Sequence, residues 1–457
     1  MAKTGASLSK MATNLYGSPQ YLDLYLYCSV GVPFSFRKNL NRWPDFSLIL
    51  RYQIGSKEDE AVDDLIAALE HPNRVRSLDL YIGSWDSRVY EVLKKLQVRF
   101  PALTRLELEG PDSDHDAEVY DISDNFLGNT APRLQHLCLD GISFQGLPKL
   151  LLSTRGLVSL QLRDIPADDF GCYGYISPEA MVGGLAGLAS LRALCIEFRS
   201  LDERSNPNER LEEDRRLHPP MRSVLPALAG FAFRGDIKYL EDLVTRIDMP
   251  SIEDIKIEFY PPWFDIPQLS QFICQTASLE LAQFRRAQVT FDTFYHQITL
   301  DRPQCERRQF HFLLTVQISE LDTAMDSDSD VLLPRMAGLL GQLTALLSNV
   351  RHLSLDSPQH WPKEMNPLDN SKLLPLLHLF PTVEELHVSG TLRRHIATAL
   401  ENIAEERVTE LMPALRSLQL GDGKEPVGPT ERFLSFRRLS GHPVDVVNNN
   451  TKDQPEG

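Results

Sequence analysis

Long apolar runs are missing from this chain. No stretch approaches the roughly 18 continuous apolar residues that a membrane helix needs, and the N-terminus lacks the apolar core of a secretory signal. Cysteine is also scarce: the six cysteines among 457 residues lie at scattered positions, and no two are spaced as Cys-x-x-Cys. We therefore expect free thiols and a cytoplasmic or nuclear protein without a disulfide framework.

Motifs that carry catalysis or hold cofactors are missing as well. The sequence contains neither of the glycine-rich phosphate-binding patterns, no Gly-x-Ser-x-Gly and no His-Glu-x-x-His. The acidic run 326–330 begins like a calcium loop, but Val331 replaces the required glycine and Ala337 the bidentate carboxylate. We expect a flexible acidic loop there, no cofactor, no metal site and no enzyme activity. Ser327 and Ser329 are candidates for phosphorylation by an acid-directed kinase.

Positive charge is in short supply. Asp and Glu number 63 against 47 Lys and Arg, which gives a formal net charge of −16. Binding to a nucleic-acid backbone depends on clustered Lys and Arg, so this balance argues against a nucleic-acid-binding protein. The same surplus fits a partner with basic groups, although acidic surfaces also keep many proteins soluble.

One phrase recurs along the chain: an apolar residue, two free positions, and then Leu-x-Leu or a close variant, usually after proline. Leu103, Leu106 and Leu108 form one copy. Copies led by proline occupy residues 101–108, 132–139, 226–233, 250–257, 381–388 and 413–420, and less regular copies begin at residues 75, 157, 191 and 350. The phrase is typical of the strand of a leucine-rich repeat.

Segments with helical periodicity lie between these strands. Val89, Val92, Leu96 and Phe100 recur at three- and four-residue spacing, which buries one helix face. Helices are expected over residues 59–71, 87–100, 177–189, 236–248, 334–347 and 392–411. Alternating strands and helices predict a parallel sheet with right-handed crossovers. We therefore predict an α/β leucine-rich-repeat solenoid (horseshoe), with parallel strands on the concave face and helices on the convex face.

The pattern predicts one continuous array of about thirteen repeats. We expect a disordered N-terminus (1–14), an irregular solenoid (15–444) and a disordered polar tail (445–457). Degraded repeats predict further strands near residues 21–27, 284–291 and 310–318. The charged segment 201–220 is expected to protrude as a loop.

The free positions of each strand point away from the buried leucines, because side chains alternate along a strand. They predict a binding surface along the concave face. Its candidate residues are Asp79, Tyr81, Arg105, Glu107, Glu109, His136, Asp140, Arg163, Glu197, Arg234, Asp254, Lys256, Glu258, His352, Asp356, Glu385 and His387. Nine of these are carboxylates and four are Lys or Arg, so the face is mixed but tilts acidic. Cys138 and Cys195 share it, about two repeats apart and too distant to bind one metal.

Residues 131–142, 175–182 and 188–191 carry a family resemblance, and residues 18–24 and 436–444 extend it. They resemble the divergent F-box and leucine-rich-repeat proteins of mushroom-forming fungi. The resemblance covers nearly the whole array and carries no catalytic residue. It implies a substrate receptor: the F-box docks on a cullin-type ubiquitin ligase and the repeats select a target, so ligase subunits are partners by this resemblance.

The F-box itself is expected to be missing, because residues 1–14 are too few for three helices. The chain is then either a truncated product or a recognition module without that docking element. The first hypothesis is a non-enzymatic protein–protein interaction scaffold that selects a substrate. The alternative is a leucine-rich-repeat inhibitor or regulator that covers a basic protein with its acidic concave face. An enzyme is disfavoured, because a curved array does not readily close a dry pocket.

Overall fold

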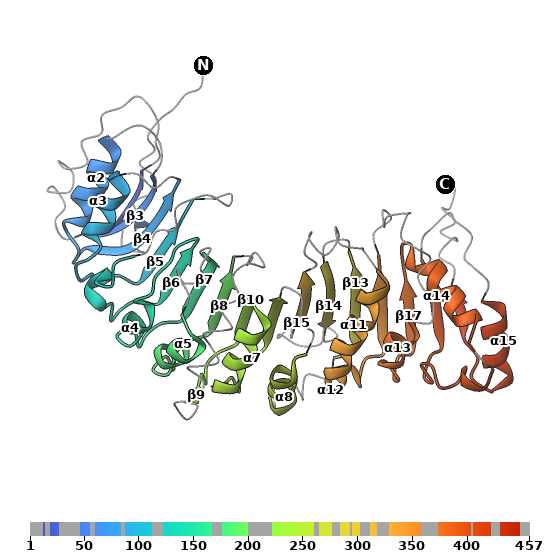
Figure 1. Ribbon diagram of the computed structural model, residues 1–457. Helices are drawn as coiled ribbons and strands as arrows, with labels where there is room; N and C mark the ends of the chain where they lie inside the picture. Colours follow the sequence, from blue (N-terminus) through green and yellow to red (C-terminus); the bar gives the residue numbers. More distant parts are fainter. Residues whose placement is uncertain are drawn as a thin grey trace, which may run out of the picture. The chain divides into compact units, whose positions relative to one another are not determined.

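The fold is described from a computed structural model of the 457-residue chain (Figure 1). The described residues are 12–13, 19–26, 46–54, 60–83, 87–111, 122–166, 176–199, 222–259, 265–276, 284–292, 295–301, 311–317, 329–357, 373–403, 405–421 and 430–447. They form an α/β architecture with a mostly parallel sheet. The chain divides into two compact units: unit 1 is Met1–Gly235 with Arg246–Ser251, and unit 2 is Asp236–Thr245 with Ile252–Gly457.

Unit 1 is built on strands that pair in chain order. From β2 to β8 each strand is parallel to the next, β10 is parallel to β8, and the short β1 is antiparallel to β2. The strands are β1 (Ala12–Thr13), β2 (Pro19–Leu26), β3 (Ser47–Ile54), β4 (Val75–Ile82), β5 (Arg105–Glu109), β6 (His136–Asp140), β7 (Ser159–Ile165), β8 (Ala193–Phe198) and β10 (Gly230–Gly235). Two further strands, β9 (Ser223–Val224) and β11 (Ile247–Asp248), form a separate parallel pair.

The helices of unit 1 lie along one side of its sheet (Figure 1). They are α2 (Glu60–Leu69), α3 (Ser87–Lys95), the 3-10 helix η1 (Phe126–Asn129), α4 (Leu147–Leu151) and α5 (Pro178–Leu185). Helix α5 begins at a capped N-terminus: the Ser177 hydroxyl accepts a hydrogen bond from the Ala180 amide at 3.2 Å, with Pro178 at the first helical position. This capping fixes where the chain leaves its loop and turns into the helix.

The apolar positions of the phrase form the core. Leu103, Leu106 and Leu108 are fully buried, whereas Arg105 and Glu109 between and beyond them are exposed. Several neighbouring repeats are joined by the same backbone contact ahead of the strand, for example the Gln135 amide donating to the Thr104 carbonyl at 2.8 Å. The same contact recurs through both units, so the spacing of the phrase sets the register of the strands.

Unit 2 has a different strand order. Its sheet runs β12, β15, β14, β13, β16, β17, β18, β19, and β14 is antiparallel to both of its neighbours. The strands are β12 (Asp254–Phe259), β13 (Arg286–Phe291), β14 (Tyr295–Asp301), β15 (His311–Gln317), β16 (His352–Asp356), β17 (Glu385–Val388), β18 (Ser417–Leu420) and β19 (Asp445–Val447). The expectation of parallel strands in chain order is therefore wrong between β12 and β16. A hairpin reverses the chain there, and the Asp292 amide donates to the Tyr295 carbonyl at 2.9 Å.

The helices of unit 2 follow most of its strands. They are α7 (Ile237–Arg246), α8 (Pro267–Gln275), α11 (Ser329–Gln342), α12 (Thr344–Leu347), α13 (Leu373–His378), α14 (Leu392–Glu401), the 3-10 helix η3 (Glu405–Arg407) and α15 (Glu431–Leu439). Glu241 of α7 accepts hydrogen bonds from the Gln268 and Leu269 amides, both at 2.8 Å, and so caps the N-terminus of α8. Among the described residues, none of the helices is long and apolar enough to cross a membrane.

Most expected elements are present with shifted ends. Helix α14 ends at Glu401, ten residues before the expected end of its segment, and α11 begins at Ser329, before the expected start at 334. Strand β19 begins at Asp445, the residue chosen as the start of a disordered tail, because its amide pairs with the Arg416 carbonyl at 2.8 Å. The expected loop 201–220, Ser327 and the tail beyond 447 lie outside the described residues.

Candidate binding face

The outward side chains of unit 1 stand in rows across the strands. The first row is Ser77, Arg105, His136, Ser159, Ala193 and Gly230, and the second is Asp79, Glu107, Cys138, Gln161, Cys195 and Ala232. The third row runs through Tyr81, Glu109, Asp140 and Arg163, and resumes with Glu197 and Arg234. We call these three rows the ladder face. It brings together every candidate residue that the sequence analysis places on β4–β10.

Carboxylates dominate the ladder face on β4, β5 and β6. Asp79 is the register partner of Glu107, and Glu109 is the register partner of Asp140. Arg105 lies 2.8 Å from Glu107, and Arg51 of β3 lies 3.8 Å from Asp79. Burial raises the pKa of the Asp79 carboxyl, and the neighbouring Glu107 raises it further against the opposing effect of both arginines.

In the first two rows of the ladder face, the side chains on β8 and β10 are small and uncharged. Ala193, Gly230 and Ala232 leave the backbone lightly covered, and a Cβ added to Gly230 would meet no atom within 4 Å. Cys138 and Cys195 lie in this region with Gln161 between them in the register. We call Ala193, Gly230 and Ala232 the floor of the ladder face.

Both thiols stay protonated at neutral pH. Burial raises the pKa of Cys138 to about 12, with the nearby Glu107 carboxylate as the next cause. Burial and Glu197 raise the pKa of Cys195 to about 12, and its Sγ lies 3.4 Å from Glu197 Oε1. Reactive cysteines depend on a lowered pKa, so these two act as small neutral side chains rather than as nucleophiles.

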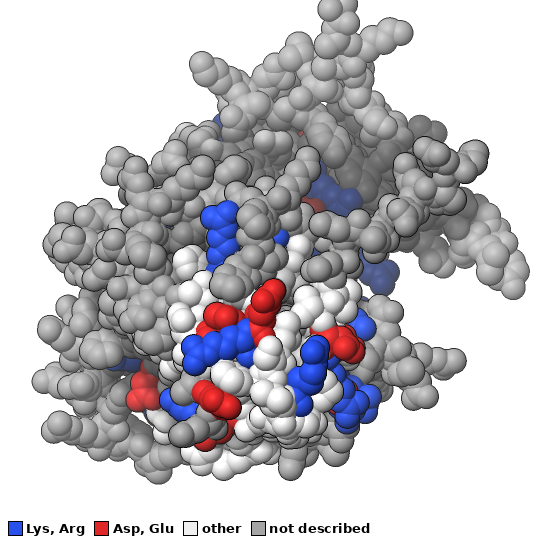
Figure 2. Space-filling view, turned by 90° about the vertical axis from the view of Figure 1, so that its right-hand side faces the viewer, with Lys and Arg blue, Asp and Glu red and all other residues white. Residues whose placement is uncertain are grey.

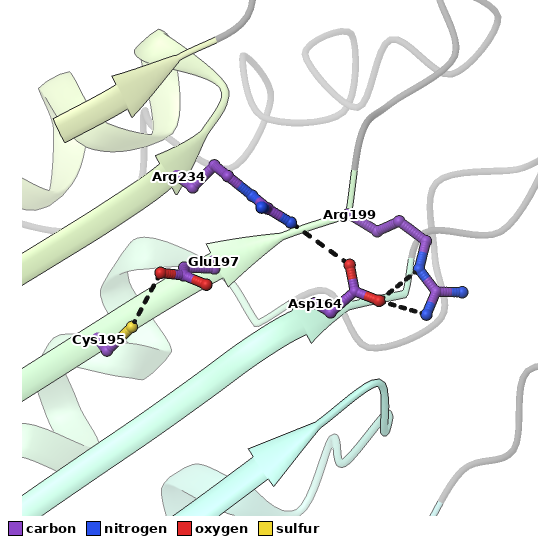
Figure 3. A network of polar contacts seen from close by, with 5 residues as sticks. All are labelled: Asp164, Cys195, Glu197, Arg199 and Arg234. Carbon is purple, nitrogen blue, oxygen red and sulfur yellow. Dashed lines mark hydrogen bonds and ion pairs between the residues drawn. The ribbon is translucent and has the colours of Figure 1, made fainter. Parts of the chain in front are cut away.

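A network of ion pairs borders this floor at the strand ends (Figure 3). Asp164 adopts a left-handed φ of 46° at an irregularity in the β7–β8 register, which turns its carboxylate outward. Arg199 Nε donates to Asp164 Oδ2 at 2.8 Å and Arg199 Nη2 donates to the same oxygen, while Arg234 Nη2 reaches Oδ1 at 3.5 Å. The bulge thus holds two guanidinium groups in place beside Glu197.

In the same region, Asp140 stands at the border between the acidic strands and this network. Burial raises the pKa of its carboxyl, and Asp164 and Glu197 raise it further, against Arg163 and Arg234. The charges around Asp140 are therefore mixed, as are those around Asp79, where Glu107 stands against Arg51 and Arg105.

Unit 2 carries a second set of outward polar residues. On β16 and β17, Asp356 accepts hydrogen bonds from Gln288 Nε2 at 2.8 Å, Ser354 Oγ at 3.2 Å and Ser389 Oγ at 2.6 Å. Ser354 Oγ also lies 3.3 Å from His387 Nδ1. The Asp356 carboxylate therefore accepts hydrogen bonds from β13, from β16 and from the residue that follows β17, whereas Asp79 in unit 1 has an ion pair with Arg51.

Ser354, His387 and Asp356 have the residue types of a hydrolase triad but not its geometry. In a triad the carboxylate contacts the imidazole and orients it toward the hydroxyl. Here Asp356 contacts Ser354 rather than His387. The three side chains are joined as neighbours on adjacent strands, and the arrangement does not activate the hydroxyl.

Charged pairs continue along the outer strands of unit 2. His352 Nδ1 lies 2.8 Å from Glu385 Oε2, and Glu384 lies between Arg351 at 3.1 Å and Arg416 at 4.0 Å. Figure 2 shows the C-terminal end of this unit, where basic and acidic groups are interspersed around uncharged surface. Negative charge in this part of unit 2 is thus accompanied by positive partners.

The remaining candidates fall into separate parts of the molecule. Asp254, Lys256 and Glu258 alternate on β12 in unit 2, away from the β16–β17 cluster in the strand order. His136 belongs to unit 1 and His387 to unit 2. Among the described residues, no group of three or more His, Cys, Asp or Glu side chains is placed to hold a metal ion.

Sequence reasoning missed several residues of these faces. Arg51 lies on β3, whose alternating Leu48, Leu50, Tyr52 and Ile54 are a strand signal without the leucine-rich phrase. Asp164 and Arg199 lie at strand ends beyond the free positions of the phrase. Gln288 lies on a predicted strand, but the pairing of β13 with β16 that brings it to Asp356 depends on the hairpin.

In comparisons with known proteins, no protein-family model matches the chain, and no curated protein matches it.

Proposed function

We propose that this protein is a non-enzymatic recognition scaffold of the leucine-rich-repeat solenoid class, which binds a protein partner through its ladder face. The observation that carries the proposal is the register of unit 1, which sets outward side chains of β4 to β10 in three rows. Strands about 4.8 Å apart place these side chains close enough for one partner segment to contact several of them.

The recurring phrase and the helices on the opposite side of the unit 1 sheet support the solenoid assignment. Proteins of this class use extended sheet faces to bind partners. The resemblance to F-box and leucine-rich-repeat receptors extends the proposal to target selection for a ubiquitin ligase. Under that extension the ladder face selects the target, and ligase subunits would accompany it.

The test is affinity capture from the native source with the protein and two matched variants. Ala193→Arg with Ala232→Arg adds bulk at two small positions of the ladder face without touching the core. Ala180→Arg places the same side chain at an exposed position on α5. A partner identified by mass spectrometry should be lost with the ladder-face variant and kept with the α5 variant. Equal retention by both variants would refute recognition through this face.

A second candidate function is supported by the carboxylates on β4, β5 and β6. A regulator that covers a basic protein would use them, and its binding would weaken as salt screens the charges. Glu107→Lys combined with Glu109→Lys should abolish that binding, because each substitution places a positive charge on β5 where a carboxylate stands. Binding that is insensitive to salt would favour the general scaffold over the regulator.

A further inference from the structure

The last described strand of unit 2, β19, presents an open edge. On one side it is parallel to β18, where Val446 is the register partner of Leu418 and lies between Asp445 and Val447. Among the described residues, no strand pairs with the other side of β19. The backbone N–H and C=O groups along such an edge can pair with a strand from another chain.

The backbone groups of Val446 lie on this open side. The Asp445 amide donates to the Arg416 carbonyl at 2.8 Å, so the polar backbone groups of Asp445 point toward β18. Successive residues of a parallel strand direct their N–H and C=O groups to opposite sides of the strand. Val446 therefore offers one donor and one acceptor at the open edge.

Apolar side chains are exposed in the same segment. Val446 occupies the position of the fully buried Leu418 in the register, yet it is 37% exposed. Val447 is 43% exposed, and Leu439 at the end of α15 is 80% exposed. Three of the seven large apolar side chains that are exposed in the described part of the chain thus lie within residues 439–447. Exposed apolar side chains that are gathered in this way indicate a contact surface.

Buried contacts hold this edge in place. Arg437 of α15 is fully buried, and its Nη2 donates to the Leu415 carbonyl ahead of β18 at 2.9 Å. The His442 amide donates to the Arg437 carbonyl at 2.9 Å, which fixes the segment that leads into β19. The edge is therefore formed before any partner arrives, and binding requires little ordering of the backbone.

The charges around the edge are balanced. The exposed charged residues between 430 and 447 are two acidic side chains, Glu431 and Asp445, and two basic ones, Arg432 and Arg438. Figure 2 shows uncharged surface among basic and acidic groups at this end of unit 2. The whole chain carries a formal net charge of −16. The local balance allows two copies of the chain to approach here without net repulsion.

We propose that this edge binds a second copy of the chain, with the two β19 strands antiparallel about a two-fold axis at Val446. Each Val446 would then exchange N–H and C=O hydrogen bonds with the second copy's Val446. Asp445 would face the second copy's Val447, whereas an axis at Asp445 would set two carboxylates opposite each other. Both Val446 side chains would lie on one face of the joined sheet, and the same surface serves both copies.

A second copy fits this edge better than an unrelated strand. Because β19 has only three residues, backbone pairing alone supplies few hydrogen bonds. A second copy also brings its own exposed Leu439, Val446 and Val447, so apolar surface is covered on both sides of the contact. The inference is independent of the proposed function, since the ladder face belongs to unit 1. A dimer would carry two ladder faces and bind a repetitive partner more tightly than the single chain.

The first test is sedimentation equilibrium of the full chain between about 1 and 100 μM, the range of a weak interface. The dimer fraction should rise with concentration. Leu439→Asp with Val446→Asp should raise the dimer dissociation constant at least about tenfold, because charge replaces apolar contact. The matched control, Leu152→Asp with Val224→Asp, changes two exposed apolar residues of unit 1 and should raise it less than about twofold. A monomer throughout, or equal weakening by both pairs, would overturn the proposal.

The second test locates the two-fold axis by oxidation of single-cysteine substitutions at the edge. Val446→Cys should form a disulfide between copies, because hydrogen-bonded partners have Cα atoms about 5.5 Å apart, within the range that a disulfide needs. Val447→Cys should form none, because two residues along and one strand across separate its Cα atoms by about 8 Å. Peptide mapping without reduction identifies the joined positions, and the unsubstituted protein shows any contribution of native thiols.

A disulfide at position 447, or none at position 446, would overturn the two-fold pairing. Neither result touches the proposed function, which is tested by affinity capture with the ladder-face variant. Circular dichroism of each variant confirms that it is folded, and the cysteine substitutions add no charge to the edge.

Discussion

The two units share one repeating phrase but use their outward positions differently. In unit 1, Asp79 faces Glu107 across neighbouring strands, and burial with like charge raises its pKa. In unit 2, Asp356 is surrounded by the donors of Gln288, Ser354 and Ser389. The difference shows that the apolar positions of the phrase determine the fold, whereas the side chains at its outward-facing positions can differ between the units without changing that fold. Asp356 is thus satisfied by neutral hydrogen-bond donors, whereas Asp79 is opposed by a like charge and balanced only by the ion pair with Arg51 and the nearby Arg105.

The largest predicted effect tests whether the units unfold separately. Leu108 in unit 1 and Leu355 in unit 2 are both fully buried. Leu108→Ala and Leu355→Ala should each lower the free energy of unfolding by about 2–5 kcal/mol, through lost burial and the cavity left behind. Hydrogen exchange with mass spectrometry should show faster exchange in the unit that carries the substitution. Equal acceleration in both units by either variant would contradict the division.

Substitutions at two glycines compare a tight turn in unit 2 with the open floor of the ladder face in unit 1. Gly390 has a φ of 66°, and an added Cβ would lie 1.9 Å from the Ser357 carbonyl oxygen. Gly390→Ala should cost about 2–4 kcal/mol through strain and overpacking. Gly230→Ala meets open space and should change stability little or raise it by about 0.4–1 kcal/mol. Chemical denaturation measures both, and a loss of similar size at Gly230 would mean that the floor is closely covered.

Much of the strand pattern could be predicted because the leucines in each copy of the phrase indicate which positions of that strand are buried. The core positions of β5 and β6 alternate as the leucines indicate, and the outward rows follow from that alternation. Strand β3 escaped prediction because Ser47–Ile54 has the alternation without the phrase. The strand order around β14 could not be read from the repeats, since it depends on a hairpin that pairs strands out of chain order.

The binding residues were predictable only in part. Arg105 and Glu107 lie on a strand whose register the phrase determines, so their place on the ladder face follows from the sequence. Asp164 lies at a bulge with left-handed backbone, and its pairing with Arg199 and Arg234 depends on how three strand ends meet. No spacing within the sequence carries that information.

The smallest predicted effect concerns pH and the Asp79 carboxyl. Its pKa in the folded protein lies above the ordinary value of 3.8, so the folded state holds this proton more tightly than the unfolded state. Stability due to this group is therefore lost as pH rises from 3.8 through the raised pKa. Asp79→Asn should remove that loss, with a gain at neutral pH that stays within about 1 kcal/mol because the side chain is 41% exposed and screened by solvent.

Urea denaturation of Asp79→Asn and of the unsubstituted protein across this pH range measures the difference between them. The gain should disappear below pH 3.8, where Asp79 is protonated in both states. Glu385→Gln is the comparison from unit 2, and it should not stabilise because Glu385 contacts His352. A stabilisation of equal size there would remove the contrast between the two faces.

The register of the ladder face is tested most directly by oxidative cross-linking. Gln161 lies between Cys138 and Cys195 in the register, about 4.8 Å from each neighbouring strand, whereas the two cysteines lie on strands about 9.6 Å apart. A disulfide needs Cα atoms about 4.4–6.8 Å apart. Gln161→Cys should therefore form a disulfide with Cys138 or Cys195 under oxidation at alkaline pH, where thiolate forms despite the raised pKa of both native thiols, and the unsubstituted protein should form none between those two. A disulfide joining Cys138 to Cys195 directly, or none after the substitution, would contradict the rows on which the account depends.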